Sequence, residues 1–307
     1  MTDLPEPEPR AFFGRRLEPQ ASVLHGAGQD PGTFQRYTDL MAERHTRPVM
    51  AMLYASPAGL AKRLRAAASD YAALGKSSPP GFLQLGLSMT RDGQPEKHYE
   101  HRVAEGEFDE DLRAGFAALK ECGLPAYVRI GYEFNGPWNG YEADTYVPAF
   151  RRVARLLRES RAPAATVWCA EAGKLENFMD FYPGDEWVDW WSIDIFATDH
   201  FQMAVPFLEA AHEHRRPVMI GESTPRRVGV EDGPESWERW FAPYFRLIRS
   251  WPGVKAFCYI NWNWAATENW PDWGNARIED DPFVLSAFRE EIRHPIYCHL
   301  DTPREAL

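Results

Sequence analysis

The sequence lacks the features that define several large classes of protein. It contains no run of lysine and arginine, and its formal net charge is −11, so a nucleic-acid backbone is not an expected partner. No segment approaches the roughly eighteen consecutive apolar residues of a membrane-spanning helix. The acidic balance favours solubility. We therefore expect a chain that binds neither nucleic acid nor membrane; nothing in the sequence indicates its oligomeric state.

Cysteines are few and widely spaced. The four of them, Cys122, Cys169, Cys258 and Cys298, form no CxxC pair, so neither a structural zinc site nor a disulfide framework is expected. The first residues, MTDLPEPEPRAFFGRR, have no apolar segment of the kind found in a signal peptide. We therefore expect a cytoplasmic protein, or a secreted one if a leader has been trimmed away.

Aromatic side chains, in contrast, are abundant. They make up 14% of the 307 residues and include 12 tryptophans. Some belong to the core, but this content also favours flat, amphipathic contact surfaces for a ligand.

Strand-like and helix-like segments alternate along the chain. The predicted strands are 22–28, 48–56, 81–89, 126–134, 165–172, 189–196, 217–224 and 254–262, and the predicted helical segments are 33–46, 59–75, 105–123, 143–160, 175–181, 205–216, 234–251 and 282–293. Continuously apolar strands indicate a parallel sheet covered on both faces. Eight such units predict an α/β fold with a single (β/α)8 TIM barrel.

A doubly wound open sheet is the competing fold. The segment GAGQDPG (26–32) follows the first strand, but it has neither the GxGxxG spacing nor the P-loop lysine of that class. We see no interdomain linker. We therefore expect one catalytic barrel domain over residues 1–307, with the barrel at about 22–293 and short terminal extensions.

Carboxylates stand where several of the predicted strands end. They are Glu133, Glu171, Asp194 and Glu222, and each closes an apolar run in which a charge is costly unless it is paired or used. Catalytic groups of a (β/α)8 barrel lie at the carboxyl ends of its strands. Glu133 and Glu222, on the fourth and seventh strands, form a pair suited to glycoside hydrolysis, with one carboxyl protonated and the other ionised. The structural alternative is an ion pair with an arginine such as Arg129 or Arg226.

Three motifs resemble those of retaining glycosidases of clan A, most closely glycoside hydrolase family 26. RIGYEFNGPWNGY (129–141) resembles the family's strand-four motif, RPVMIGEST (216–224) its strand-seven motif, and YPGDEWVDWWSIDIF (182–196) its run into strand six. Weaker similarity extends from residue 24 to about 285. The family includes β-mannanases and enzymes that act on other β-glycans.

The resemblance implies roles for individual residues. Glu133 matches the acid/base and Glu222 the nucleophile, while Asn135, Gly136 and Trp138 match the loop that follows the acid. We expect Tyr132, Asn135 and Trp138 to contact substrate, with Trp138 on the side of the leaving group. Tyr132 stands where the family has a histidine that shapes the catalytic subsite. The implied activity is retaining hydrolysis of a β-linked oligo- or polysaccharide, of the β-mannan or β-glucan type, with no metal or organic cofactor.

Further candidates surround these motifs. The segment NWNWAATENWPDWGN (261–275) holds four tryptophans, and we expect Asn261, Trp262 and Trp264 to contact substrate, with Trp262 beneath the sugar that is cleaved. His25 is a candidate for sugar hydroxyls, with a structural role as an equal alternative. Asp194 is expected either to bind a hydroxyl or to hold a catalytic partner. We interpret Arg129 as a buried support for the acidic site.

Two other functions compete with this interpretation. A non-catalytic carbohydrate-binding TIM barrel would keep the tryptophans without the chemistry, but both glutamates are present. A barrel enzyme of another class would need His and Asp clusters at strand ends for a metal, or a lysine for a Schiff base. Such clusters are not found, and Lys255 falls at the amino-terminal end of its strand.

Overall fold

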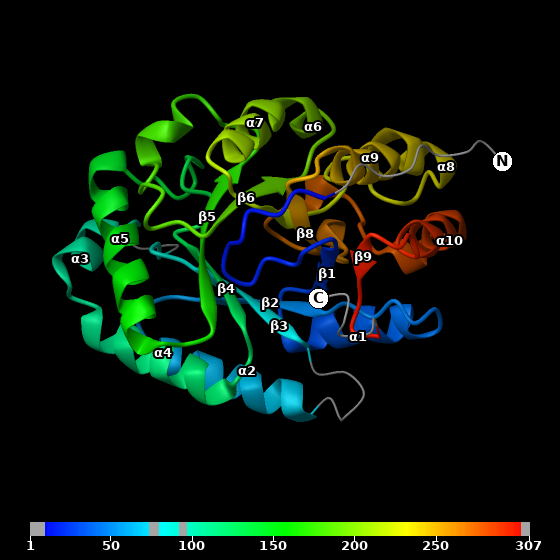
Figure 1. The fold of residues 1–307 in the computed structure, drawn as a ribbon. Helices are drawn as coiled ribbons and strands as arrows, with labels where there is room; N and C mark the ends of the chain where they lie inside the picture. The colour runs from blue at the N-terminus through cyan, green and yellow to red at the C-terminus, as the bar shows by residue number, and fades with distance from the viewer. Residues whose placement is uncertain (1–9, 74–79, 92–96, 302–307) are drawn as a thin grey trace.

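Parallel strands form the centre of the molecule and helices cover their outer side (Figure 1). The computed structural model describes residues 10–73, 80–91 and 97–301. The strands are β1 (Val23–Ala27), β2 (Met50–Ala55), β3 (Phe82–Leu87), β4 (Ala126–Ile130), β5 (Ala164–Glu171), β6 (Trp190–Ile195), β7 (Val218–Ser223) and β8 (Val254–Tyr259). Since β1 pairs with both β2 and β8, the sheet closes on itself. The predicted (β/α)8 barrel is confirmed.

The helices follow the strands in the expected order. They are α1 (Pro31–Ala42), α2 (Leu60–Ala73), α3 (Glu100–Glu105), α4 (Asp109–Cys122), α5 (Ala143–Ser160), α6 (His200–Met203), α7 (Val205–Glu213), α8 (Pro234–Ser236), α9 (Ala242–Ser250) and α10 (Pro282–Glu291), with a π-turn at Trp237–Phe241 between α8 and α9. The prediction of one helix over 105–123 was wrong at its start. Gly106 adopts φ 95° and ends α3, so α4 begins only at Asp109.

Two further differences concern segment ends. The predicted helix 59–75 reaches into residues 74–79, which lie outside the described part of the chain. A short strand that the sequence did not predict, β9 (Tyr297–Cys298), pairs in parallel with β1. No helix among the described residues is both long enough and apolar enough to span a bilayer.

Side chains alternate between the barrel interior and the helix layer along each strand. Tyr127 of β4 and Trp190 of β6 belong to the interior cluster, whereas Val128 and Ile130 belong to the larger cluster that packs against the helices. Both faces of each strand are therefore buried, which explains the continuous apolar runs in the sequence.

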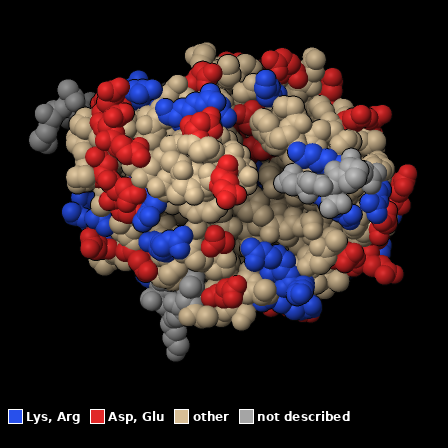
Figure 2. All heavy atoms as spheres, turned by 180° about the vertical axis from the view of Figure 1, so that it is seen from behind, with Lys and Arg blue, Asp and Glu red and all other residues tan. Residues whose placement is uncertain are grey.

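The amino-terminal segment covers one end of the barrel. Tyr127 donates its hydroxyl to the carbonyl of Leu17 (2.6 Å), and Trp190 donates its indole N–H to that of Arg16 (2.7 Å). Lys255 Nζ donates to the carbonyls of Ala11 and Gln20 at the same end, where the strands begin, as predicted for this lysine. The segment crosses in front of the strands in Figure 1. The opposite face, at the carboxyl ends of the strands, is hollowed near its centre (Figure 2).

Candidate active site

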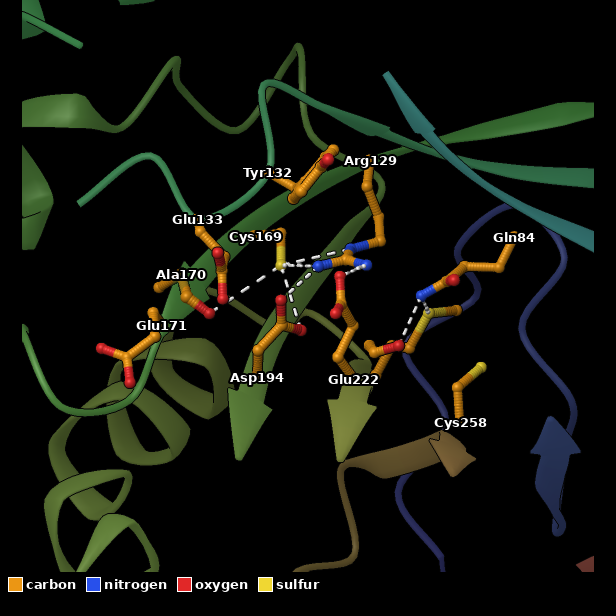
Figure 3. A network of polar contacts seen from close by, with 12 residues as sticks. Gln84, Arg129, Tyr132, Glu133, Cys169, Ala170, Glu171, Asp194, Glu222 and Cys258 are labelled. Atoms are coloured by element: carbon orange, nitrogen blue, oxygen red, sulfur yellow. Dashed lines mark hydrogen bonds and ion pairs between the residues drawn. The ribbon is translucent and has the colours of Figure 1, made fainter. Parts of the chain in front are cut away.

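A buried arginine organises the polar groups at the carboxyl ends of the strands. Arg129 of β4 is fully buried and donates through Nη1 to Oε1 of Glu222 (2.9 Å) and through Nη2 to the carboxylate of Asp194. Cys169 Sγ accepts from the same guanidinium at 3.0 and 3.3 Å. Figure 3 shows these side chains gathered around Arg129. The expectation that Arg129 is a buried support is therefore confirmed.

Glu222 faces this network because of an irregularity in β7. Strict alternation would place residues 218, 220 and 222 on one face, and Val218 and Ile220 do belong to the cluster packed against the helices. The pairing of β7 with both neighbouring strands shifts register before Ser223. A β-bulge of this kind re-aims a side chain. Glu222 consequently turns inward and reaches Arg129, and only 8% of the residue remains exposed.

The neighbouring glycine makes room for this arrangement. A Cβ at Gly221 would lie 2.5 Å from Ser192 Oγ, 2.8 Å from Asp194 Oδ1 and 3.0 Å from Arg129 Nε. Any larger residue at position 221 would therefore displace the groups that hold Glu222.

Glu133 lies in a turn and not, as predicted, at the end of a strand. β4 ends at Ile130, and Glu133 adopts φ 50°, in the left-handed region that non-glycine residues seldom occupy. Asn139 stabilises the turn by donating its side-chain amide to the carbonyls of Tyr132 (2.9 Å) and Glu133 (3.0 Å). The indole N–H of Trp138 donates to Oε2 of Glu133 (2.7 Å). The sequence placed Glu133 at the barrel mouth correctly but missed the turn that orients it.

Burial and neighbouring negative charge favour the protonated form of Glu133. Desolvation raises the pKa of Glu133 well above its ordinary value, and the charges of Asp194 and Glu222 raise it further; the hydrogen bond from Trp138 and the charge of Arg129 act in the opposite direction. Glu222, in contrast, accepts a hydrogen bond from the buried guanidinium of Arg129. The two glutamates thus differ in their nearest hydrogen-bond donor, which is a cation for Glu222 and a neutral indole for Glu133.

Tyr132 occupies the wall beside this pair. Its ring lies 4.9 Å from Arg129 Cζ and packs edge-on against Tyr54 at 5.5 Å between centroids. Tyr54, which the sequence did not single out, has a buried hydroxyl with no hydrogen-bond partner among the described residues. Tyr132 is half-buried, so its predicted contact with substrate stays a prediction.

Two predicted sugar contacts are fully buried instead. His25 has 0% exposure, and its ring nitrogens face Tyr37 Oη (2.9 Å) and His299 Nδ1 (3.0 Å). It shares the outward face of β1 with Val23 and Ala27, so it belongs to the helix layer. Asp194 also has 0% exposure and holds Arg129. The structural alternative is therefore correct for His25, and Asp194 acts by holding a partner.

Two predicted amide contacts are already occupied by the protein. Asn135 donates to the carbonyls of Glu171 and Lys174 and accepts from the N–H of Glu171, so it joins the turn after β4 to the end of β5. Asn261 donates to Glu279 (2.7 Å) and accepts from the N–H of Ile278 (2.9 Å). Both residues hold loops in place. Asn135 uses both of its side-chain N–H groups in these contacts, whereas Asn261 uses one and also lines a depression with Trp262, so its contact with substrate stays a prediction.

The tryptophans after β8 differ in exposure. β8 ends at Tyr259, so the predicted strand 254–262 was too long, and Trp262 and Trp264 lie in the following loop. Trp264 is 5% exposed and donates to Thr224 Oγ1 (3.0 Å), which corrects its expected role as a sugar contact. Trp262 is half-buried and lines a shallow depression beside Gly28 and Ile260. Trp138 is 40% exposed. Contact of Trp262 and Trp138 with substrate stays a prediction.

Among the described residues, no group of three or more His, Cys, Asp or Glu side chains is arranged to hold a metal ion.

Known proteins resemble this chain in both sequence and fold. Residues 96–222 match the model of glycosyl hydrolase family 26. A β-1,3-xylanase from Alcaligenes sp is 28% identical over 92% of this chain and 66% of its own length, and the β-1,3-xylanase TXYA from Vibrio sp is 27% identical over 91% and 66%. The chain thus spans just under two thirds of these relatives.

Solved structures support the same assignment of fold. A double mutant of an endo-β-1,4-mannanase from Cellulomonas fimi has a TM-score of 0.65 at 15% identity, over 93% of this chain and 73% of that one. Identity at this level speaks for the fold alone, whereas the family model includes both Glu133 and Glu222. The chain is therefore similar to glycosyl hydrolase family 26 over residues 96–222, a span that holds both Glu133 and Glu222.

Proposed function

We propose that the chain is a retaining glycoside hydrolase that cleaves β-linked polysaccharide, with Glu222 as the nucleophile and Glu133 as the acid/base. The observation that carries the proposal is the opposite environment of two carboxyl groups at one barrel mouth. The cation of Arg129 lies 2.9 Å from the Glu222 carboxylate, while burial and the charges of Asp194 and Glu222 raise the pKa of Glu133. A pair of carboxyl groups with separated protonation states is what glycoside hydrolysis needs.

The reaction proceeds in two displacements. Glu133 donates its proton to the glycosidic oxygen while the Glu222 carboxylate attacks the anomeric carbon, which yields a covalent glycosyl–enzyme and the free leaving sugar. Glu133, now ionised, removes a proton from water, and the water attacks the same carbon from the side of the departed sugar. The product keeps its anomeric configuration. Arg129 stabilises the Glu222 carboxylate before attack and again after its release.

The substrate class follows from two lines of support. The relatives named β-1,3-xylanases align over more than nine tenths of this chain, which makes a β-1,3-xylan the first substrate to test. The β-mannan and β-glucan types remain the other candidates, since a mannan endo-1,4-β-mannosidase from Bacillus subtilis and endoglucanase H from Acetivibrio thermocellus also match parts of the chain. A non-catalytic sugar-binding barrel is not favoured, because Glu133 and Glu222 are both present with the surroundings that the chemistry needs.

A panel of defined glycans tests the proposal. The purified chain is incubated with β-1,3-xylan, β-1,4-mannan and mixed β-glucan oligosaccharides, and the first products are examined by proton NMR. Release of the β-anomer before mutarotation supports retention. Initial release of the α-anomer contradicts the assigned roles, and no hydrolysis of any of the three glycans contradicts the proposed function.

A further inference from the structure

The loop after β8 carries tryptophans that contact one another in a row. Trp264 lies edge-on to Trp262 at 5.0 Å and to Trp270 at 5.6 Å between ring centroids. Trp264 also donates its indole N–H to Thr224, two residues beyond Glu222. The nearly buried Trp264 therefore links Trp270 to the end of the strand that carries the proposed nucleophile.

Trp270 is the exposed end of this row. It is 42% exposed, in contrast to 5% for Trp264. An exposed tryptophan usually costs little and needs no explanation when it stands alone. Trp270 instead packs against Trp264 and Trp273, on the same face of the barrel as the other loops that follow strands.

The loop that presents Trp270 is held by contacts along its length. Asn263 and Asn275 form an antiparallel bridge that closes it, and Trp273 packs near Trp264 at 5.0 Å and near Trp270 at 6.3 Å. Arg227 donates to Asp272 at 2.8 and 3.1 Å, which ties the loop to the segment after β7. An indole fixed in this way loses little conformational entropy when a ligand covers it, a property of aromatic anchors in binding sites.

We propose that Trp270 is a distal sugar platform, on which a pyranose ring of the polysaccharide stacks outside the subsite where cleavage occurs. The proposal rests on the proposed function for the identity of the ligand. A sugar ring has apolar C–H groups on its faces and hydroxyls at its edge, so it suits an indole that is apolar on its face and solvated around it. Continuity with the tryptophan row favours the substrate chain itself as the occupant. With this platform, the affinity of the protein for its substrate increases with the length of the sugar chain.

A binding experiment tests the platform without depending on turnover. Glu222→Gln serves as the parent, and it is compared with Glu222→Gln combined with Trp270→Ala, Trp270→Tyr or Phe283→Ala by affinity electrophoresis in gels that contain β-1,3-xylan, β-1,4-mannan or β-glucan. Phe283 is the matched control, because it is 45% exposed but lies on α10. We expect Trp270→Ala to weaken binding about tenfold, equivalent to roughly 1.4 kcal/mol. Trp270→Tyr should recover most of the affinity, and Phe283→Ala should bind like the parent.

Kinetics in the active background provide the second readout. Trp270→Ala should raise KM for long oligosaccharides more than for the shortest one that is cleaved, with kcat little affected, because a distal contact contributes equally to the ground and transition states. Equal binding of Trp270→Ala and the parent, an equal change of KM at all lengths, or a parent retarded by none of the glycans would each overturn the platform. A wild-type chain that binds a glycan through Trp270 but hydrolyses none would instead refute the proposed function alone.

Discussion

The ends of β4 and β7 each present a glutamate to the same barrel mouth, but they do so in different ways. Glu222 lies within β7, and a β-bulge turns it toward a cation buried in the barrel. Glu133 lies in a turn three residues beyond β4, and its carboxylate accepts a hydrogen bond from the neutral indole of Trp138. The comparison shows that two residues of one type can have different surroundings at one barrel mouth, with a cation beside Glu222 and a neutral indole beside the buried Glu133.

The two positions also differ in how they are held. Glu222 is part of a hydrogen-bonded sheet, and sites built on strands keep their geometry better than sites on loops. Glu133 depends on side-chain amides: Asn139 holds its turn, and Asn135 ties the same turn to the end of β5. We therefore expect the nucleophile to be the more rigid of the pair, while the acid is more sensitive to changes in the loop.

Replacement of Glu222 should cause the largest loss of activity. Glu222→Ala removes the group that forms the covalent intermediate, and we expect kcat to fall by at least about 10⁴-fold. Azide should restore turnover of an activated aryl glycoside by entering the space left by the carboxylate, with a glycosyl azide of inverted configuration as the product. Glu171→Gln, a strand-end glutamate with no contact to Arg129 among the described residues, should keep most of the activity. A larger loss for Glu171→Gln than for Glu222→Ala would remove Glu222 from its role.

Replacement of Glu133 should have a smaller effect that depends on the substrate. Glu133→Ala removes the proton donor, and a general acid contributes about 10²–10⁴-fold to rate. The loss of rate should be largest for substrates with poor leaving groups, since the leaving group of an activated aryl glycoside needs little protonation to depart. Steady-state kinetics on a natural oligosaccharide and on an aryl glycoside measure the difference. Equal losses on both would show that Glu133 is not the acid.

The sequence predicts the barrel well because its signal is repeated. Eight apolar runs separated by amphipathic helices leave few other folds, and the end of each run marks the barrel mouth to within a few residues. This was enough to bring Glu133, Glu222 and Asp194 to one place, and to identify Arg129 as buried. The assignment of catalytic roles to the two glutamates came from motif resemblance and stays a proposal.

The local features that determine the direction of each side chain could not be predicted from the sequence in the same way. Both faces of a barrel strand are buried, so the sequence does not tell which face His25 occupies, and its partner His299 follows β9, which the sequence did not predict. The β-bulge near Gly221 cannot be recognised in the sequence, because it lies within a continuous run of apolar residues. Within residues 261–275, the chain folds back on itself, so spacing does not indicate which tryptophan is buried, and Trp270 was missed while Trp264 was chosen.

Arg129→Met removes the cation that lies beside Glu222 and has no counterpart at hydrogen-bonding distance from Glu133 among the described residues. It leaves Asp194 buried without its ion pair, and breaking a buried pair typically destabilises a protein by about 3–5 kcal/mol. The loss should be largest at neutral pH and smaller in acid, because carboxyl groups that take up protons no longer carry the unpaired charge. Chemical denaturation at several pH values measures this. Arg216→Met is the control: Arg216 is equally buried but donates mainly to backbone carbonyls, so its cost should depend little on pH. The same pH dependence in both variants would contradict the proposed charge balance.

Trp138→Phe tests the role of Glu133 through its hydrogen bond to a neutral indole. The Trp138 indole donates to the Glu133 carboxylate, which favours the ionised form and lowers the pKa of Glu133. Trp138→Phe removes that donor, so the pKa of Glu133 should rise and the proton should remain on it at higher pH. Since the first step needs the protonated acid, the alkaline limb of the kcat/KM profile should move to higher pH.

The change in rate itself should be modest. One hydrogen bond contributes about 1 kcal/mol, so kcat/KM at neutral pH should fall by less than about tenfold. Trp187→Phe, an indole packed under Arg158 and without contact to Glu133 among the described residues, provides the control and should leave the alkaline limb in place. A limb that moves to lower pH in Trp138→Phe would mean that a group other than Glu133 donates the proton. A limb that moves equally in both variants would mean that the shift comes from a general change in the protein and not from the lost indole donor.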